Sequence, residues 1–138
     1  MLLNWVSKDW ALANKQRLRT QKNKNMAAQQ YFLALDLKED PALIAEYKAY
    51  HQNVWPEIIE SIKSSGITCL DIYCVSNRLF MVLEANENFS FEAKSATDAA
   101  NEVVQKWETL MWTYQQAMPG SKPGEKWVLL EKIFTLPQ

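Results

Sequence analysis

The side chains best suited to proton transfer are His51 and Tyr47. His51 is the only histidine in the chain, and an unperturbed imidazole titrates at about pH 6.5, so it can donate or accept a proton near neutrality. Tyr47 stands four residues earlier, which places its hydroxyl on the same helix face. The two could therefore act on one ligand by acid–base chemistry. The alternative interpretation is that His51 bonds a backbone carbonyl and Tyr47 is ordinary core.

A second group of candidate binding residues follows on a later helical pattern. Trp107 precedes Glu108, and Glu108 shares a helix face with an indole and three amides (Trp112, Gln105, Gln115 and Gln116). An indole can pack on the C–H surface of a sugar while carboxylate and amide groups bind its hydroxyls. Periodicity alone places Trp107 in the core. It also allows Glu108 and Trp112 to lie on a solvated helix face.

Composition excludes several other kinds of chemistry. One histidine and two cysteines make a zinc site improbable, so we expect no metal. Only three glycines occur, none in a phosphate-cradling loop, and no Gly-x-Ser-x-Gly motif is present. A net charge of −1 does not favour nucleic acid or an anionic membrane, and no apolar run approaches the ~20 residues of a membrane span. Acid–base catalysis without a cofactor, or simple binding, remains.

The two cysteines indicate a reducing environment. Cys69 and Cys74 lie five residues apart on one expected strand, so alternation points them to opposite faces of the sheet. They cannot bridge each other in that arrangement. A reduced, cytoplasmic location is the simpler interpretation.

The leading segment differs in charge from the rest of the chain. Residues 1–25 hold six basic residues and one acidic residue, and they lack a clear apolar stretch for secretion. We expect residues 1–28 to be a basic extension that can form a short helix over Asp9 to Arg19, with an alternative start at Met26. A transit peptide is the other interpretation. Residues 29–138 then form one domain.

The first half of this domain has clear local signals. Tyr31 to Leu37 alternates apolar and polar positions, which predicts a strand. Asp40-Pro41 predicts a helix start that carries Tyr47 and His51, and Pro56 ends or kinks this helix near Asn53. A second helical stretch should stop at Gly66.

The second half begins with a hairpin. Residues 67–75 and 79–85 predict two strands joined at residues 76–78. A helical region follows from about Ser90, and its apolar stripe runs from Val103 to Met118, before Pro119. Trp127 to Leu136 predicts a final strand.

The order of these elements predicts an α+β fold of the ferredoxin-like βαββαβ type, with two right-handed crossovers around a central hairpin. Its helices cover only one face of the sheet. The other face, carrying either Tyr31, Leu33, Leu35 and Leu37 or their neighbours, must meet a partner or a ligand or remain polar. We therefore expect a homodimer packed sheet against sheet.

The segment Glu46–Ile58 resembles the hallmark of the L-rhamnose mutarotase family, in which a tyrosine, a histidine and a Trp-Pro-Glu triplet are each separated by three residues. Tyr47, His51 and Trp55-Pro56-Glu57 carry this pattern. The resemblance continues through Gly66 to Met118-Pro119. It implies a dimeric α+β barrel that interconverts the α and β anomers of a sugar without a cofactor.

The resemblance also implies roles for single residues. His51 matches the proton-donating histidine, Tyr47 a sugar-binding tyrosine, and Trp107 the first residue of a Trp-Trp pair. Glu108 replaces the second tryptophan, and Leu70 aligns with a binding tyrosine of the rhamnose enzymes. Both departures concern residues that would touch the sugar.

Three further stretches are closer to relatives associated with L-fucose, namely residues 34–38, 77–81 and 122–127. We therefore expect an isomerase acting on a monosaccharide, L-fucose first and L-rhamnose second. Monooxygenases of the same architecture and a non-catalytic sugar-binding module remain alternatives, because fold alone does not decide function.

Overall fold

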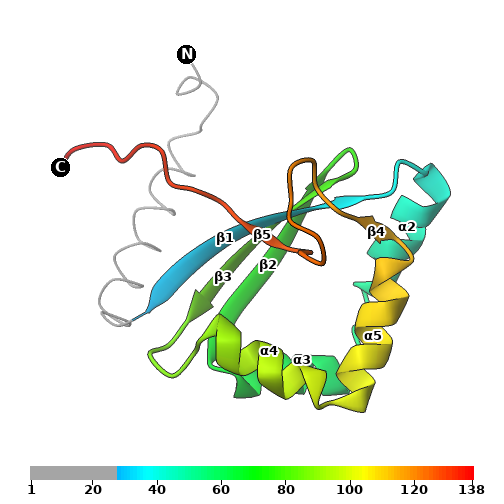
Figure 1. Cartoon of the computed structure of the whole chain (residues 1–138), viewed down its shortest axis with the longest axis horizontal. Coiled ribbons are helices and arrows are strands. Elements are labelled where there is room, and N and C mark those ends of the chain that lie inside the picture. Colours follow the sequence, from blue (N-terminus) through cyan, green and yellow to red (C-terminus); the bar gives the residue numbers. More distant parts are fainter. Residues whose placement is uncertain (1–27) are drawn as a thin grey trace.

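The computed structural model describes residues 28–138, in which one antiparallel sheet carries helices on one side (Figure 1). The N-terminal extension expected over residues 1–28, its helix and the start at Met26 lie outside the described residues except for Ala28. None of the helices in the described part is long and apolar enough to cross a membrane.

The strands form in the order that a ferredoxin-like fold requires. The sheet order is β2-β3-β1-β4, and β5 also pairs with β1. The strand bounds are as follows: β1 Gln29–Leu37, β2 Ile67–Val75, β3 Arg78–Ala85, β4 Gln115–Gln116 and β5 Val128–Leu129. All the pairings are antiparallel. The expected α+β class is thus confirmed.

Helices α2 and α3 follow β1. Helix α2 spans Pro41–Tyr50, and the Asp40 side chain caps it by accepting from the backbone N–H groups of Ala42 and Leu43. Helix α3 spans Pro56–Ser64. The predicted cap at Asp40 is confirmed, and the break between the two helices lies where Pro56 removes a backbone donor.

Helices α4 and α5 divide the second helical region. They span Phe91–Ala99 and Glu102–Trp112, and the Asn101 side chain between them caps α5. The predicted continuation to Met118 is wrong. Helix α5 ends at Trp112 because β1 captures the next residues, with the Lys38 N–H donating to the Tyr114 carbonyl at 2.9 Å and Gln115 pairing with Leu37.

The predicted final strand from Trp127 to Leu136 is also mostly wrong. Only Val128–Leu129 pairs with β1, and the last backbone contact is the Leu130 N–H donating to the Phe32 carbonyl. The remaining residues, 131–138, leave the sheet as an exposed segment (Figure 1). A strand needs a pairing partner, and this segment has none in its own sheet.

The core lies between the sheet and the helices. The helix-facing residues of β1 are Leu33, Leu35 and Leu37, so their neighbours take the opposite face. On that opposite face Phe32 of β1 is 44% exposed, and Tyr73 and Val75 of β2, on the far side of β3, are 59% and 63% exposed. The face without helices therefore exposes apolar side chains at these positions.

Candidate active site

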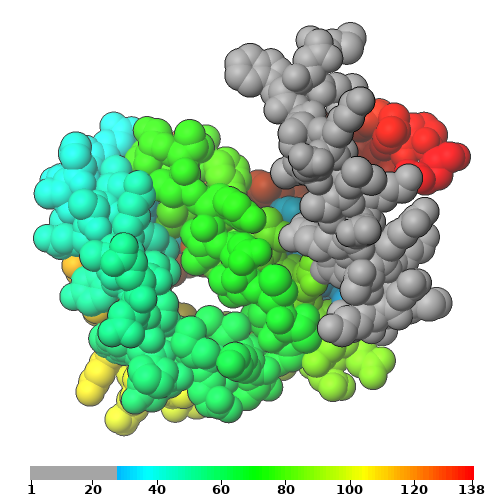
Figure 2. Space-filling view, turned by 180° about the vertical axis from the view of Figure 1, so that it is seen from behind, coloured from blue at the N-terminus to red at the C-terminus, as the bar shows by residue number. Residues whose placement is uncertain are grey.

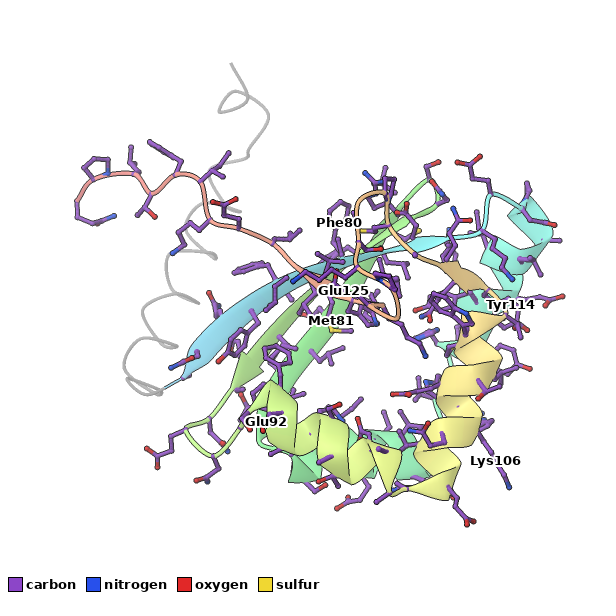
Figure 3. All side chains as sticks on the ribbon, in the orientation of Figure 1. Phe80, Met81, Glu92, Lys106, Tyr114 and Glu125 are labelled. Atoms are coloured by element: carbon purple, nitrogen blue, oxygen red, sulfur yellow. The ribbon has the colours of Figure 1, made fainter. Side chains whose placement is uncertain are left out.

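The candidate site lies between the helices and the sheet, where the space-filling view is open through the molecule (Figure 2). Two adjoining chambers occupy this region. The His51 chamber has a volume of about 400 Å³ and the Lys94 chamber about 320 Å³, sizes typical of small-molecule sites. Both share a wall, formed by Ile58, Ile62, Leu70, Met81, Trp107, Met111, Gln115 and Trp127. Figure 3 labels Met81 on the sheet side of this wall.

His51 lies at the end of helix α2, where its backbone forms the C-cap. Its Nδ1 lies 2.8 Å from the carbonyl oxygen of Tyr47, one turn earlier. The His51 ring also stacks near Tyr47, with ring centroids 4.3 Å apart, and lies 5.8 Å from Trp107. His51 therefore bonds a carbonyl, as one interpretation of the sequence expects, and it also lines the chamber.

Tyr47 is buried, with 3% of its surface exposed, and it also lines the His51 chamber. Burial raises the pKa of its hydroxyl to about 12, outweighing the Gln115 side chain, whose hydrogen bond lowers the pKa. Nε2 of Gln115 donates to the phenolic oxygen over 3.5 Å. Tyr47 is therefore a neutral hydroxyl whose own hydrogen remains available to a ligand.

Trp107 joins the two chambers. It is 8% exposed, belongs to the core and lines both chambers, so its roles in packing and in the site coincide. Trp55 and Tyr50 pack edge-on against its ring, with centroid distances of 5.0 and 6.2 Å. These contacts hold the indole rigid, as a surface for stacking a ligand requires.

Glu108 lies on the next position of helix α5 and lines the Lys94 chamber. Among the residues that the structure describes, no ion pair or hydrogen bond engages its carboxylate. Trp112, its expected neighbour on that face, stands outside both chambers with Lys126 5.3 Å above its ring. Lys106 points away from the chambers on the outer side of α5 (Figure 3).

A match to the L-rhamnose mutarotase family model covers residues 30–136. The chain belongs to this family. An L-fucose mutarotase of Xanthomonas campestris pv. campestris is 43% identical over 113 residues, which cover 80% of this chain and 90% of the relative. An L-rhamnose mutarotase of Acidiphilium cryptum is 28% identical over 107 residues, covering 76% of this chain and 97% of the relative.

The fold is also that of a solved member of the L-rhamnose mutarotase family. The crystal structure of L-rhamnose mutarotase FA22100 from Formosa agariphila superposes with a TM-score of 0.57 at 23% identity. The alignment covers 79% of this chain and 99% of that one. The expected resemblance to the family is thereby confirmed.

The candidate site contains one residue that sequence reasoning places on the wrong element, Gln115, and one that it does not select, Trp127. Periodicity places Gln115 on a helix face, but it is buried in β4, where it bonds Tyr47 and lines both chambers. Trp127 is expected only as part of a strand, and it forms part of the wall that the chambers share. The neighbouring residues in sequence do not predict the position of either side chain, because strand pairing with β1 brings each one to the site.

Residues 28–138 contain no group of three or more His, Cys, Asp or Glu side chains that could hold a metal ion. The available chemistry is a histidine, a neutral phenol, an amide, an indole and a carboxylate around a small cavity.

Proposed function

We propose that this chain is an aldose mutarotase that interconverts the α and β anomers of a 6-deoxy-hexose, with L-fucose as the preferred sugar. Membership of the family and the similarity to an L-fucose mutarotase support this proposal. The observation that carries it is the 2.8 Å contact between His51 Nδ1 and the Tyr47 carbonyl at the wall of a sugar-sized chamber.

That contact supports Nε2 as the nitrogen of His51 that exchanges protons. A carbonyl oxygen can only accept, so the hydrogen of this bond belongs to Nδ1. Nε2 is left to gain or lose a proton within the chamber. A histidine whose second nitrogen is held by a backbone carbonyl keeps one tautomer and one ring orientation.

The proposed reaction opens and recloses the sugar ring. Protonated His51 donates from Nε2 to the ring oxygen as the C1–O5 bond breaks, while the Glu108 carboxylate accepts the proton of the anomeric hydroxyl. The product is the open aldehyde. Rotation about C1–C2 and reclosure return each proton and give the other anomer. General acid–base help of this kind is worth roughly 10²–10⁴-fold.

Tyr47 and Trp107 bind and orient the sugar in this proposal. The Tyr47 hydroxyl donates to a sugar oxygen, since its own oxygen already accepts from Gln115. Trp107 supplies a rigid apolar surface for the C–H face of the ring. Because the pKa of Tyr47 is raised to about 12, the hydroxyl stays a donor throughout the neutral range.

The preference for L-fucose rests on Leu70 and Glu108. Both line the Lys94 chamber, and both differ from the tyrosine and tryptophan expected in rhamnose enzymes. Each replacement removes aromatic volume next to the sugar. L-rhamnose is the second candidate.

Saturation-transfer proton NMR of L-fucose and L-rhamnose anomers, with and without the protein, tests the activity directly. We expect faster exchange for L-fucose than for L-rhamnose. A rate equal to that in buffer for both sugars would refute the mutarotase proposal.

We also infer that two copies of the chain associate through the open face of the sheet. That face carries the exposed apolar side chains Phe32, Tyr73 and Val75. The C-terminal segment adds Ile133 and Phe134, which are 89% and 72% exposed. Apolar surface of this kind on a small domain is typical of an interface.

Light scattering after size exclusion tests this association. Tyr73→Lys should shift the mass from that of a dimer towards that of a monomer, because a dimer would have to remove the lysine charge from water at its interface. Thr109→Lys, on an exposed position of α5, serves as the control. A monomeric wild-type protein would contradict the inference.

We place the protein in a reducing compartment, the cytoplasm. Cys69 and Cys74 remain thiols in the structure and are both exposed. Thiol labelling of the protein inside intact cells should modify both residues, and thiols oxidised by intermolecular disulfides would count against this location.

A further inference from the structure

The Lys94 chamber contains a polar cluster in an otherwise largely apolar wall. Nζ of Lys94 lies 2.9 and 3.1 Å from the two carboxylate oxygens of Asp98, one helical turn later on α4. The Ser61 hydroxyl of α3 donates to the same carboxylate over 2.9 Å. Most of the surrounding wall is hydrophobic, including Leu33, Ile67, Leu83, Phe89 and Val104, and Glu108, Gln115 and Lys126 are its other polar residues.

Placing this ion pair inside a cavity has an energetic cost. The Lys94 and Asp98 side chains are only 20% and 14% exposed, so both charges are largely removed from water. Apolar side chains of similar volume often stabilise a fold as well as a buried ion pair or better. Packing against α3 alone therefore does not account for charges at this position, whereas a polar ligand in the chamber would.

The cluster also has unused hydrogen-bonding capacity. A carboxylate offers about four acceptor positions, and the Asp98 carboxylate accepts three hydrogen bonds, two from Lys94 and one from Ser61. Nζ of Lys94 lies 3.5 Å from the Ser61 hydroxyl, which is a long contact. Asp98 can accept one more hydrogen bond and Lys94 can exchange its long contact for a better acceptor. This combination matches a pair of neighbouring sugar hydroxyls.

The two chambers together position such a pair away from the reacting atoms. His51 and Tyr47 line only the His51 chamber, whereas Lys94 and Asp98 line only the Lys94 chamber. Trp107 lines both, so one sugar ring on its indole would reach across the shared wall. With the anomeric carbon beside Trp107, between His51 and the adjacent Glu108 of α5, the hydroxyls on the opposite side of the ring face Lys94 and Asp98 of α4.

We propose that Lys94 and Asp98, held by Ser61, form a second polar subsite that binds hydroxyls remote from the anomeric carbon and selects which pyranose enters. This subsite rests on the proposed mutarotase function for the orientation of the sugar. Its ligand class is a monosaccharide with two adjacent free hydroxyls on the side away from C1. The two side chains determine specificity and take no part in proton transfer.

Binding is measured through the tryptophan fluorescence of the full chain, because Trp107 and Trp127 both line the chambers. The variants are Lys94→Met, which keeps the apolar stem, and Asp98→Asn, which keeps the shape. Each should weaken L-fucose binding about 10-fold or more, the range for a lost hydrogen bond to a charged group. Lys94→Arg retains the charge and should recover part of the affinity.

The decisive readout is discrimination among L-fucose derivatives that lack the hydroxyl at C2, C3 or C4. The wild-type protein should bind at least one derivative more weakly than L-fucose. Lys94→Met or Asp98→Asn should bind that derivative and L-fucose equally. A purely structural role would instead weaken every sugar by the same factor and leave the discrimination intact, and this result would overturn the proposal.

Gln105→Ala provides a matched control. Gln105 Nε2 donates to the Asp98 carbonyl over 2.9 Å and ties α5 to α4, but its side chain is exposed and lies outside both chambers. This variant should lower thermal stability without changing discrimination. An equal loss of discrimination in Gln105→Ala would overturn the subsite.

Anomer exchange by NMR is recorded on the same samples. If the wild-type protein binds and discriminates sugars without accelerating exchange, the mutarotase function fails while the subsite stands. If it binds no 6-deoxy-hexose, both proposals fail.

Discussion

The Nδ1 atom of His51 lies 2.8 Å from the carbonyl oxygen of Tyr47, four residues earlier along the same helix. The sequence spacing that places both side chains on one face also places this carbonyl beneath the imidazole. The histidine is therefore oriented by its own helix. The same residue, Tyr47, contributes its backbone to hold the imidazole of His51, the proposed proton-transfer group, and its side chain to the chamber wall.

Replacing His51 by asparagine separates orientation from proton transfer. An asparagine amide can still donate to the Tyr47 carbonyl, but it has no nitrogen that titrates near neutrality. We expect His51→Asn to remain folded and to lose roughly 10²–10⁴-fold of the acceleration of L-fucose anomer exchange. NMR exchange rates and circular dichroism of the same sample measure both properties.

His51→Lys is a useful companion, because it restores a protonated donor of different reach. In both variants the affinity for the sugar should fall much less than the rate of anomer exchange. If His51→Asn exchanged the anomers at the wild-type rate, another group would have to transfer the proton.

The buried hydroxyl of Tyr47 should make the fold sensitive to alkaline pH. Burial raises its pKa from 10.0 to about 12, so the folded chain holds its proton between these values while the unfolded chain releases it. The stabilisation is complete below pH 10 and is lost as the pH rises towards 12. The expected loss in the free energy of unfolding is roughly 2–3 kcal/mol.

Urea unfolding at pH 9 to 12 measures this dependence. Tyr47→Phe cannot ionise and should show a smaller drop over the same interval. Burial, together with Glu46, also raises the pKa of Tyr114, so some alkaline dependence must remain in the variant. An unchanged slope in Tyr47→Phe would mean that the phenol is not the group responsible.

Sugar preference should move towards L-rhamnose when the two departures from the rhamnose pattern are reversed. Leu70 and Glu108 both line the Lys94 chamber, so Leu70→Tyr with Glu108→Trp restores an aromatic wall there. We expect kcat/KM for L-fucose to fall and the ratio of L-rhamnose to L-fucose to rise about 10-fold or more.

Each single variant supplies the control for the double one. Because Glu108 is also the proposed acceptor for the anomeric proton, Glu108→Trp alone should lower kcat for both sugars. Leu70→Tyr alone should change KM more than kcat. A double variant with the original preference would remove Leu70 and Glu108 from the specificity argument.

Local signals predict much of the fold. Asp40-Pro41 defines the start of α2, and a turn at residues 76–77 joins β2 to β3, because each signal depends on side chains next to it in sequence. The end of α5 is not predictable in this way. Its apolar stripe continues beyond Trp112, but hydrogen bonds to β1 compete with further helix.

The candidate site shows the same division between local and distant effects. The sequence spacing of Tyr47 and His51 and the position of Trp107 predict three residues that the structure brings to one cavity. Gln115 and Trp127 reach that cavity only through strand pairing, so their positions there do not follow from the residues next to them in sequence. The side chain at Lys94 likewise has the sequence context of an ordinary charged residue on a surface helix.

Gly66 offers a last prediction, because it joins α3 to β2 at the border of the Lys94 chamber. Its φ is +101°, and a Cβ there would lie 2.6 Å from Oδ1 of Asn86 and 3.2 Å from Phe89. Asn86 is exposed, but its Oδ1 accepts a hydrogen bond from the Asn88 N–H, and Phe89 is buried and lines the chamber. Relieving the close approaches would therefore break this turn and move a core side chain. Gly66→Ala should therefore destabilise the fold by about 2–4 kcal/mol, from backbone strain and overpacking together.

Gly120→Ala isolates the backbone contribution, because Gly120 has a φ of +80° and a Cβ at this position would meet no other atom within 4 Å. That variant should lose only about 1–2 kcal/mol. Urea unfolding of both variants compares the two effects directly. If Gly66→Ala were no less stable than Gly120→Ala, the approach of Asn86 and Phe89 would not constrain this junction. The wall of the Lys94 chamber would then be able to rearrange around an added Cβ.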